Sequence, residues 1–183
     1  MNQETEQQLI ESIRSGSRQA MRRLYDRYSG CAMAVALRYV PQHYEALDVM
    51  QDGFVKILTT VSRFSFRGEG SLKAWVCRIV ANQALDYLKE RERLSFVSDV
   101  PDEADEEPPD VEHIPTEELT RMIGMLPTGY RAVLNMFVFE QLSHKEIAQR
   151  LNISESTSAS QFNRAKKKLA QLLKEYLNQQ EGQ

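Results

Sequence analysis

A strongly acidic segment divides this chain into two parts. Between Leu94 and Thr120 the sequence holds ten acidic residues, four of the six prolines, and no Lys or Arg. Because proline removes backbone hydrogen-bond donors and like charges repel one another, such a segment is unsuited to a packed core. The sequence therefore predicts two small domains, residues 1–93 and residues 118–183, joined by a flexible acidic linker at residues 94–117.

The net charge of −3 hides the character of the two domains. Of the 26 acidic residues, only 16 remain outside the acidic segment, and they face 23 Lys and Arg. The rest of the chain is therefore basic, which suits a polyanionic partner such as nucleic acid. Two interpretations of the linker stay open. It is either a solvated tether that only sets the reach between the domains, or an acidic decoy that lies along a basic surface until nucleic acid displaces it.

Signals of several other protein classes are missing from the sequence. The two cysteines, Cys31 and Cys77, cannot build a disulfide framework or a zinc site, and we interpret them as small buried hydrophobic residues. The three histidines show no nucleophile–base or metal spacing, so we expect no enzyme, no metal and no other cofactor. The chain starts without a basic-then-apolar leader and has no apolar run near the ~20 residues of a membrane span. We therefore expect a cytoplasmic protein without membrane insertion.

The spacing of apolar residues predicts helices in both domains. Strand-like alternation is almost absent, and apolar side chains recur at steps of three and four. The expected fold class is therefore all-α, with four helices in each domain. We expect helices at about 5–28 (interrupted near 15–17), 29–40, 44–64, 71–93, 116–126 and 130–139, with two more after these.

The C-terminal domain carries a helix-turn-helix pattern. Ser143 and Glu146 have the spacing of a capping box, and Asn152 tolerates the left-handed backbone of a tight turn. The next helix has short polar side chains at its start and cations further on, the order that a recognition helix needs in a major groove. A solvated face on an ordinary helical hairpin is the alternative. The residues expected to face DNA are Ser156, Ser160, Gln161, Asn163, Arg164, Lys167 and Lys168.

An acidic and polar stripe lies on one predicted helix of the N-terminal domain. Asp48, Gln51 and Asp52 are spaced i, i+3 and i+4, so they share one face. This face is either a contact surface for a partner or only a solvated surface.

The loop that follows this helix interleaves aromatic and basic residues. Phe64 and Phe66 alternate with Arg63 and Arg67, a pairing that can stack on and neutralise single-stranded nucleic acid. The alternative is that both phenylalanines belong to the core.

Longer segments resemble a known family. The run DVMQDGF at 48–54 resembles the core-binding segment of the extracytoplasmic-function sigma factors of bacterial RNA polymerase. The run SFRGEGSLKAWVCRIVANQALDYL at 65–88 resembles their promoter-melting segment. After the linker, LPTGYRAVLNMFVFEQLSHKEIAQRLNIS at 126–154 and a basic helix follow in the family's domain order. The chain is therefore similar to this family over nearly its whole length except the linker.

The resemblance implies a specificity subunit of the polymerase and not an enzyme. Such a protein binds the RNA polymerase core enzyme and directs transcription initiation by recognising −35 duplex DNA and capturing melted −10 DNA. The implied partners are the core enzyme, promoter DNA and an anti-sigma factor. The residues implied to face the core enzyme are Asp48, Gln51, Asp52 and Phe54.

The resemblance also implies roles in promoter binding. Phe66 and Asn82 match positions that shape the pocket for a flipped −10 base, whereas we interpret Trp75 as a core residue more than as a base wedge. The residues expected to contact −10 DNA are Arg63, Phe64, Phe66, Arg67, Trp75, Arg78 and Asn82.

In the second helix of the helix-turn-helix, the resemblance assigns −35 reading to Ser160, Asn163 and Arg164, with Lys167 and Lys168 on the DNA backbone. Where the family often has a β-branched residue followed by Lys or Arg, this chain has Ser158-Ala159, so −35 specificity is not carried over. A one-component regulator with the same helix-turn-helix is the competing hypothesis, and it predicts binding to duplex DNA without polymerase.

Overall fold

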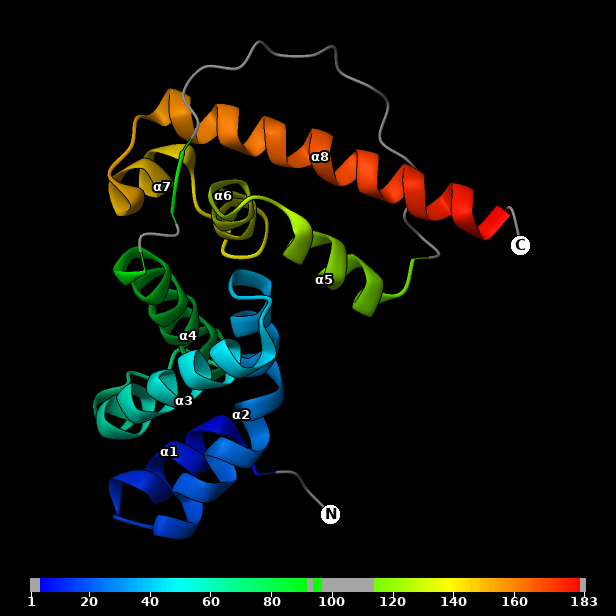
Figure 1. Cartoon of the computed structure of the whole chain (residues 1–183). Helices are drawn as coiled ribbons and strands as arrows, with labels where there is room; N and C mark the ends of the chain where they lie inside the picture. Colours follow the sequence, from blue (N-terminus) through cyan, green and yellow to red (C-terminus); the bar gives the residue numbers. More distant parts are fainter. Residues whose placement is uncertain (1–3, 92–93, 97–113, 182–183) are drawn as a thin grey trace. The chain divides into compact units, whose positions relative to one another are not determined.

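The computed structural model describes residues 4–91, 94–96 and 114–181, so most of the predicted linker lies outside the described residues. All regular secondary structure in these ranges is helical, which confirms the all-α fold class (Figure 1). The chain divides into two compact units, Met1–Tyr87 and Leu88–Gln183. Within the described ranges, no helix has the length and apolar character needed to cross a membrane.

Four α-helices and a short 3-10 helix build the N-terminal unit. Buried apolar side chains from each of the four helices form its core, and they include Leu9, Leu24, Ile57 and Leu72. The elements are α1 (Glu6–Arg14), α2 (Arg18–Tyr39), α3 (His43–Thr60), η1 (Val61–Arg63) and α4 (Ser71–Glu90), the last of which ends beyond the unit boundary.

The boundary between two helices predicted near Ser29 is wrong, because α2 continues through Ser29 and Gly30. The interruption predicted near 15–17 is confirmed, since Gly16 has a φ of 85° there and Ser17 caps α2 with its side chain. Ser29 and Gly30 are weak helix formers. They remain helical because apolar residues of α2 before and after them are buried, namely Leu24, Tyr28, Ala32 and Val35.

A carboxylate from the first helix caps the fourth. Glu6 is 2% exposed, and its two carboxylate oxygens accept hydrogen bonds from the backbone N–H groups of Leu72 (2.9 Å) and Lys73 (3.2 Å). The Tyr28 hydroxyl donates a third hydrogen bond, at 2.8 Å. Burial alone would raise the pKa of Glu6, but these bonds outweigh burial, so the pKa is lowered. The start of α4 therefore depends on a side chain 66 residues away.

Gly53 permits a close approach between α3 and α4. A Cβ atom added at Gly53 would lie 3.1 Å from the Val80 Cγ2 atom. A larger residue at this position would press on the Val80 side chain, because protein cores leave little empty space.

The C-terminal unit also contains four helices beyond the linker. Their buried residues come from every helix, with Met122, Met136, Ile147 and Ala165 among them. The elements are α5 (Thr116–Met125), α6 (Thr128–Val138), α7 (His144–Leu151) and α8 (Glu155–Glu181).

Buried Arg131 fixes the turn between α5 and α6. Its Nη1 atom donates hydrogen bonds to the carbonyl oxygens of Gly124 (3.0 Å) and Leu126 (2.7 Å). These carbonyls lie at the end of α5, where helical partners are missing. Burial lowers the pKa of Arg131 to about 10, so the side chain keeps its charge at neutral pH.

Candidate nucleic-acid interface

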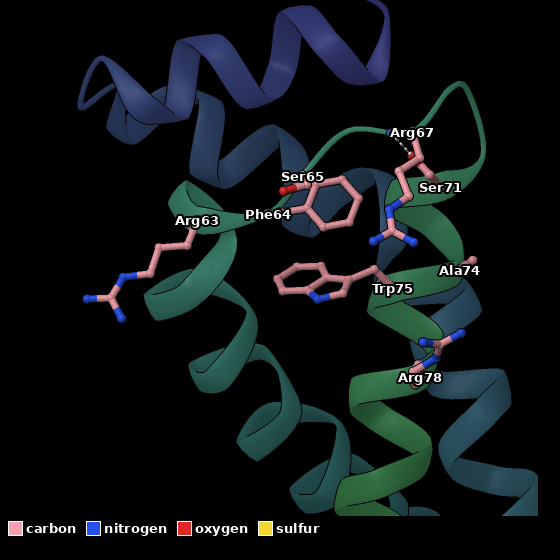
Figure 2. A pocket seen from close by; sticks show the side chains of 8 residues that line it. All are labelled: Arg63, Phe64, Ser65, Arg67, Ser71, Ala74, Trp75 and Arg78. Atoms are coloured by element: carbon pink, nitrogen blue, oxygen red, sulfur yellow. Dashed lines mark hydrogen bonds between the residues drawn. The ribbon is translucent and has the colours of Figure 1, made fainter.

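A pocket of about 420 Å³ lies between the start of α4 and the loop that precedes it (Figure 2). Two aromatic rings of its lining pack against each other, because the ring centroids of Phe64 and Trp75 are 5.0 Å apart at an interplanar angle of 44°. Both side chains are partly exposed. The residues that line the pocket are Arg63, Phe64, Ser65, Arg67, Ser71, Ala74, Trp75 and Arg78.

Hydrogen bonds from α1 hold the aromatic side of this pocket. Arg14 donates from Nε to the carbonyl oxygen of Ser62 at 3.0 Å and from Nη2 to that of Phe64 at 2.6 Å. The backbone that carries the Phe64 ring is therefore anchored to a helix 50 residues earlier in the chain.

The other side of the loop is held by Ser71 and two glycines. The Ser71 hydroxyl donates to the carbonyl oxygen of Gly68 at 2.6 Å and accepts from the backbone N–H of Arg67 at 3.2 Å. Gly68 and Gly70 have φ angles of 109° and 87°, in the region that glycine adopts most easily. These contacts close a tight turn directly before α4.

Three arginines belong to the lining of this pocket. Arg63, Arg67 and Arg78 are exposed. Figure 2 shows Arg67 reaching towards Trp75, whereas Arg63 extends away from the rings. Aromatic faces that can stack on a base, next to cations that can meet phosphates, are the arrangement found in proteins that bind single-stranded nucleic acid.

The structure brings together five of the seven residues predicted for −10 DNA. Phe66 and Asn82 are half-buried and do not belong to the pocket lining, although Asn82 follows Arg78 by one turn of α4. Trp75 lines the pocket and is not fully buried, so the interpretation of this residue as core describes only part of its surroundings.

A second surface runs along the exposed face of α3. Asp48, Gln51 and Asp52 are all exposed on it. Sequence reasoning missed two apolar members of the same face, Tyr44 at 83% exposure and Val55 at 63%. Their spacing from Asp48, one turn before and two turns after, was a signal that could have found them.

Phe54 does not belong to this exposed face, so its predicted contact with the polymerase core is wrong for the structure seen here. The side chain is 3% exposed, and its ring centroid lies 4.7 Å from that of Tyr25 in α2. Phe54 follows Met50 by one turn and precedes Ile57, and these two residues are buried in the core.

The helix-turn-helix of the C-terminal unit has the local contacts that the sequence predicts. Ser143 and Glu146 form a capping box in both directions, and Asn152 adopts the left-handed conformation with φ 55°. Ser154 accepts a hydrogen bond from the backbone N–H of Thr157 at 2.9 Å at the start of α8. The hydrogen bonds from Ser143 lower the pKa of Glu146.

The polar face of α8 carries six of the seven residues predicted to face DNA. Gln161 is the exception and the prediction for it is wrong in this structure, because the residue is fully buried. It falls on the inward face with Ser158 and Ala165, and its Oε1 atom would lie 3.2 Å from a Cβ added at Gly129 in α6. The six residues with solvent exposure are Ser156, Ser160, Asn163, Arg164, Lys167 and Lys168.

No metal centre accompanies these surfaces in the part of the chain that the structure describes, where no three His, Cys, Asp or Glu side chains gather as ligands would.

Comparison with known proteins identifies two family segments. The model of sigma-70 region 2 matches residues 24–94, and that of sigma-70 region 4 matches residues 116–169. The chain is 31% identical over 176 residues to an ECF RNA polymerase sigma-E factor of Escherichia coli, covering 88% of this chain and 91% of the relative. It is 29% identical over 194 residues to an RNA polymerase sigma-H factor of Pseudomonas aeruginosa, covering 98% and 99%.

The fold is also similar to that of a solved structure. A sigma factor from Bartonella quintana, crystallised with an anti-sigma factor, matches with a TM-score of 0.50 at 22% identity over 79% of this chain and 91% of that one.

Proposed function

Because the chain belongs to the extracytoplasmic-function sigma factors of the sigma-70 family, we propose specific roles for the three surfaces described above. As a sigma factor, the protein serves transcription initiation by RNA polymerase. It acts by binding and not by catalysis, and its place of action is the cytoplasm, where bacterial polymerase works.

The exposed face of α3 binds the polymerase core enzyme. Its acidic residues Asp48 and Asp52 provide charge that can steer association, and the neighbouring Tyr44 and Val55 provide apolar area that gains from burial. Their presence beside the acidic residues supports a contact surface over a merely solvated face.

The pocket that Phe64 and Trp75 help to line captures a base of the melted −10 element. This pocket is the single observation that best supports the proposal, since its lining combines two aromatic rings with three arginines. Flipping a base out of a duplex costs a few kcal/mol, which stacking on an aromatic ring and phosphate contacts can offset. Melting can then proceed on binding energy alone.

The polar face of α8 reads the −35 element. Ser160, Asn163 and Arg164 would meet base edges and Lys167 and Lys168 the phosphate backbone; the support is that all five keep solvent exposure on this face. Buried Gln161 is left out of this surface. The acidic linker stays a proposed tether, or a decoy for nucleic acid, between the two units.

An anti-sigma factor is a further proposed partner. The Bartonella sigma factor with a similar fold was crystallised with one. Such a partner would act by covering the surfaces that core enzyme or promoter DNA requires.

The experiment that tests the core-binding role is a pull-down with polymerase core enzyme. Reversing two charges, Asp48→Arg with Asp52→Arg, should abolish capture, because like charges across a contact face cost several kcal/mol. The matched control is Glu11→Arg with Asp26→Arg, which reverses two exposed charges on α1 and α2. Circular dichroism must show that both variants are folded.

Equal capture of the two double variants would contradict the assignment of this face. A wild-type protein that ignores core enzyme yet binds promoter duplex unaided would instead support the one-component regulator.

A further inference from the structure

Two cysteines far apart in the sequence meet between α2 and α4. The Sγ atoms of Cys31 and Cys77 are 3.9 Å apart, and the Cys77 thiol donates to the Cys31 sulfur. Both cysteines are free and only partly buried. The pair therefore differs from the small buried hydrophobes that the sequence alone suggested.

The surroundings make the two thiols unequal. The hydrogen bond from Cys77, helped by the positive charge of Lys73, outweighs burial and lowers the pKa of Cys31 below the ordinary range of a thiol. The same hydrogen bond, together with burial, raises the pKa of Cys77. Cys31 is thus the more acidic and more nucleophilic sulfur, while Cys77 holds its proton beside it.

We propose that Cys31 and Cys77 form a peroxide-sensitive thiol pair that closes to a disulfide between α2 and α4. The oxidant is a hydroperoxide. In the first step the Cys31 thiolate sulfur attacks one peroxide oxygen, an S–O bond forms and the O–O bond breaks. The leaving alkoxide or hydroxide takes a proton from solvent, and Cys31 becomes a sulfenic acid.

In the second step Cys77 resolves the sulfenic acid. Its sulfur loses the proton and attacks the Cys31 sulfur, an S–S bond forms and the S–O bond breaks. The hydroxide that leaves combines with the proton to give water. The first step itself prepares the second, because it removes the anionic neighbour that kept the Cys77 proton in place. Two thiols are oxidised, and one peroxide is reduced to an alcohol or water plus a second water.

The position of the pair connects this chemistry to the DNA pocket. Cys77 lies in α4 between Trp75 and Arg78, both of which line the pocket. A bond to α2 would fix this part of α4 against its neighbour. In a reducing cytoplasm a disulfide of this kind is transient, as expected of a sensor and not of a structural link.

The test treats the reduced full-length protein with hydrogen peroxide and maps peptides by mass spectrometry without reduction. The expected product is an intramolecular Cys31–Cys77 peptide pair that lacks two hydrogen atoms and is restored by dithiothreitol. With Cys77→Ser, a sulfenic acid should accumulate at Cys31 and be trapped by dimedone. In the folded wild type without peroxide, limiting iodoacetamide should alkylate Cys31 at an initial rate at least tenfold higher than Cys77, because both thiols then keep the contacts that make them unequal.

Labelling in urea provides the control for the fold. There iodoacetamide should alkylate the two cysteines of the wild type at equal rates, because the contacts that distinguish them are gone. Equal initial rates in the folded wild type, a disulfide only between two chains, or no disulfide in the wild type would overturn the proposal.

Discussion

The two regions that we propose to bind DNA are held in place by contacts of opposite range. The helix-turn-helix is fixed by local hydrogen bonds, such as the capping box between Ser143 and Glu146, three residues apart. The pocket depends on Arg14 and Glu6, which reach 50 and 66 residues along the chain to Phe64 and Leu72. A hydrogen bond between residues three or four apart can be predicted from a short stretch of sequence, whereas one between distant residues becomes visible only in the folded chain.

The largest expected effect comes from removing the long-range cap of α4. Replacing Glu6 by Gln puts an N–H₂ group among hydrogen-bond donors, and we expect the free energy of unfolding of the N-terminal unit to fall by about 2 kcal/mol. Trp75 is the single tryptophan, so its fluorescence during urea unfolding reports this unit. The control is Glu11→Gln, an exposed position on α1 that should change little. Equal urea midpoints of unfolding for the two variants would show that the Glu6 cap contributes nothing to the stability of the N-terminal unit.

The same carboxylate makes the N-terminal unit sensitive to acid. Since the folded-state pKa of Glu6 lies below its ordinary value of 4.5, the ionised form stabilises the fold. This contribution is complete above the unfolded-state pKa and is lost as the pH falls through the lowered folded-state pKa. The wild type should therefore lose more stability than Glu6→Gln as the pH drops below about 4.5, measured by the same fluorescence.

A smaller effect should distinguish the two phenylalanines of the loop. Phe64→Ala removes a ring that lines the pocket, and we expect about tenfold weaker capture of single-stranded −10 DNA, because stacking on one base is worth about 1–3 kcal/mol. Phe66→Ala, outside the lining, should cost less. The measurement is fluorescence of a base analogue in a −10 oligonucleotide bound by the holoenzyme. A larger loss with Phe66→Ala would move the binding site away from the described pocket.

The smallest effect is expected from removing the local cap of α7. Ser143→Ala removes the cap of α7 and should cost about 1 kcal/mol, so the amides of residues 144–151 should exchange with deuterium about fivefold faster. Lys145→Ala, exposed on the first turn of the same helix, is the control. If Ser143→Ala also slowed or weakened −10 capture, the local cap of α7 and the long-range contacts of the pocket would not act independently.

This contrast explains which sequence predictions succeeded. The all-α fold and the caps of the helix-turn-helix follow from apolar spacing and from side chains that act on their own backbone within three or four residues. Asn152 adopts the left-handed turn for the same local reason.

The errors arise where packing of distant elements decides a side chain's surroundings. Phe54 and Gln161 sit next to exposed residues in their helices, but neighbouring helices cover them. Their burial depends on α2 and α6, which a window of one helix does not contain. The meeting of Cys31 and Cys77 was hidden in the same way, because it depends on how α2 packs on α4.

The Glu6 cap bears on how this protein can be dissected. The matched segment of region 2 starts at residue 24, after α1 has ended. A fragment cut there would keep every residue of the pocket lining yet lose both side chains that α1 contributes beneath it. We therefore expect the smallest piece that can fold to be longer than the segment matched by similarity. The independently folding fragment should begin no later than Thr5, whose side chain caps α1 itself.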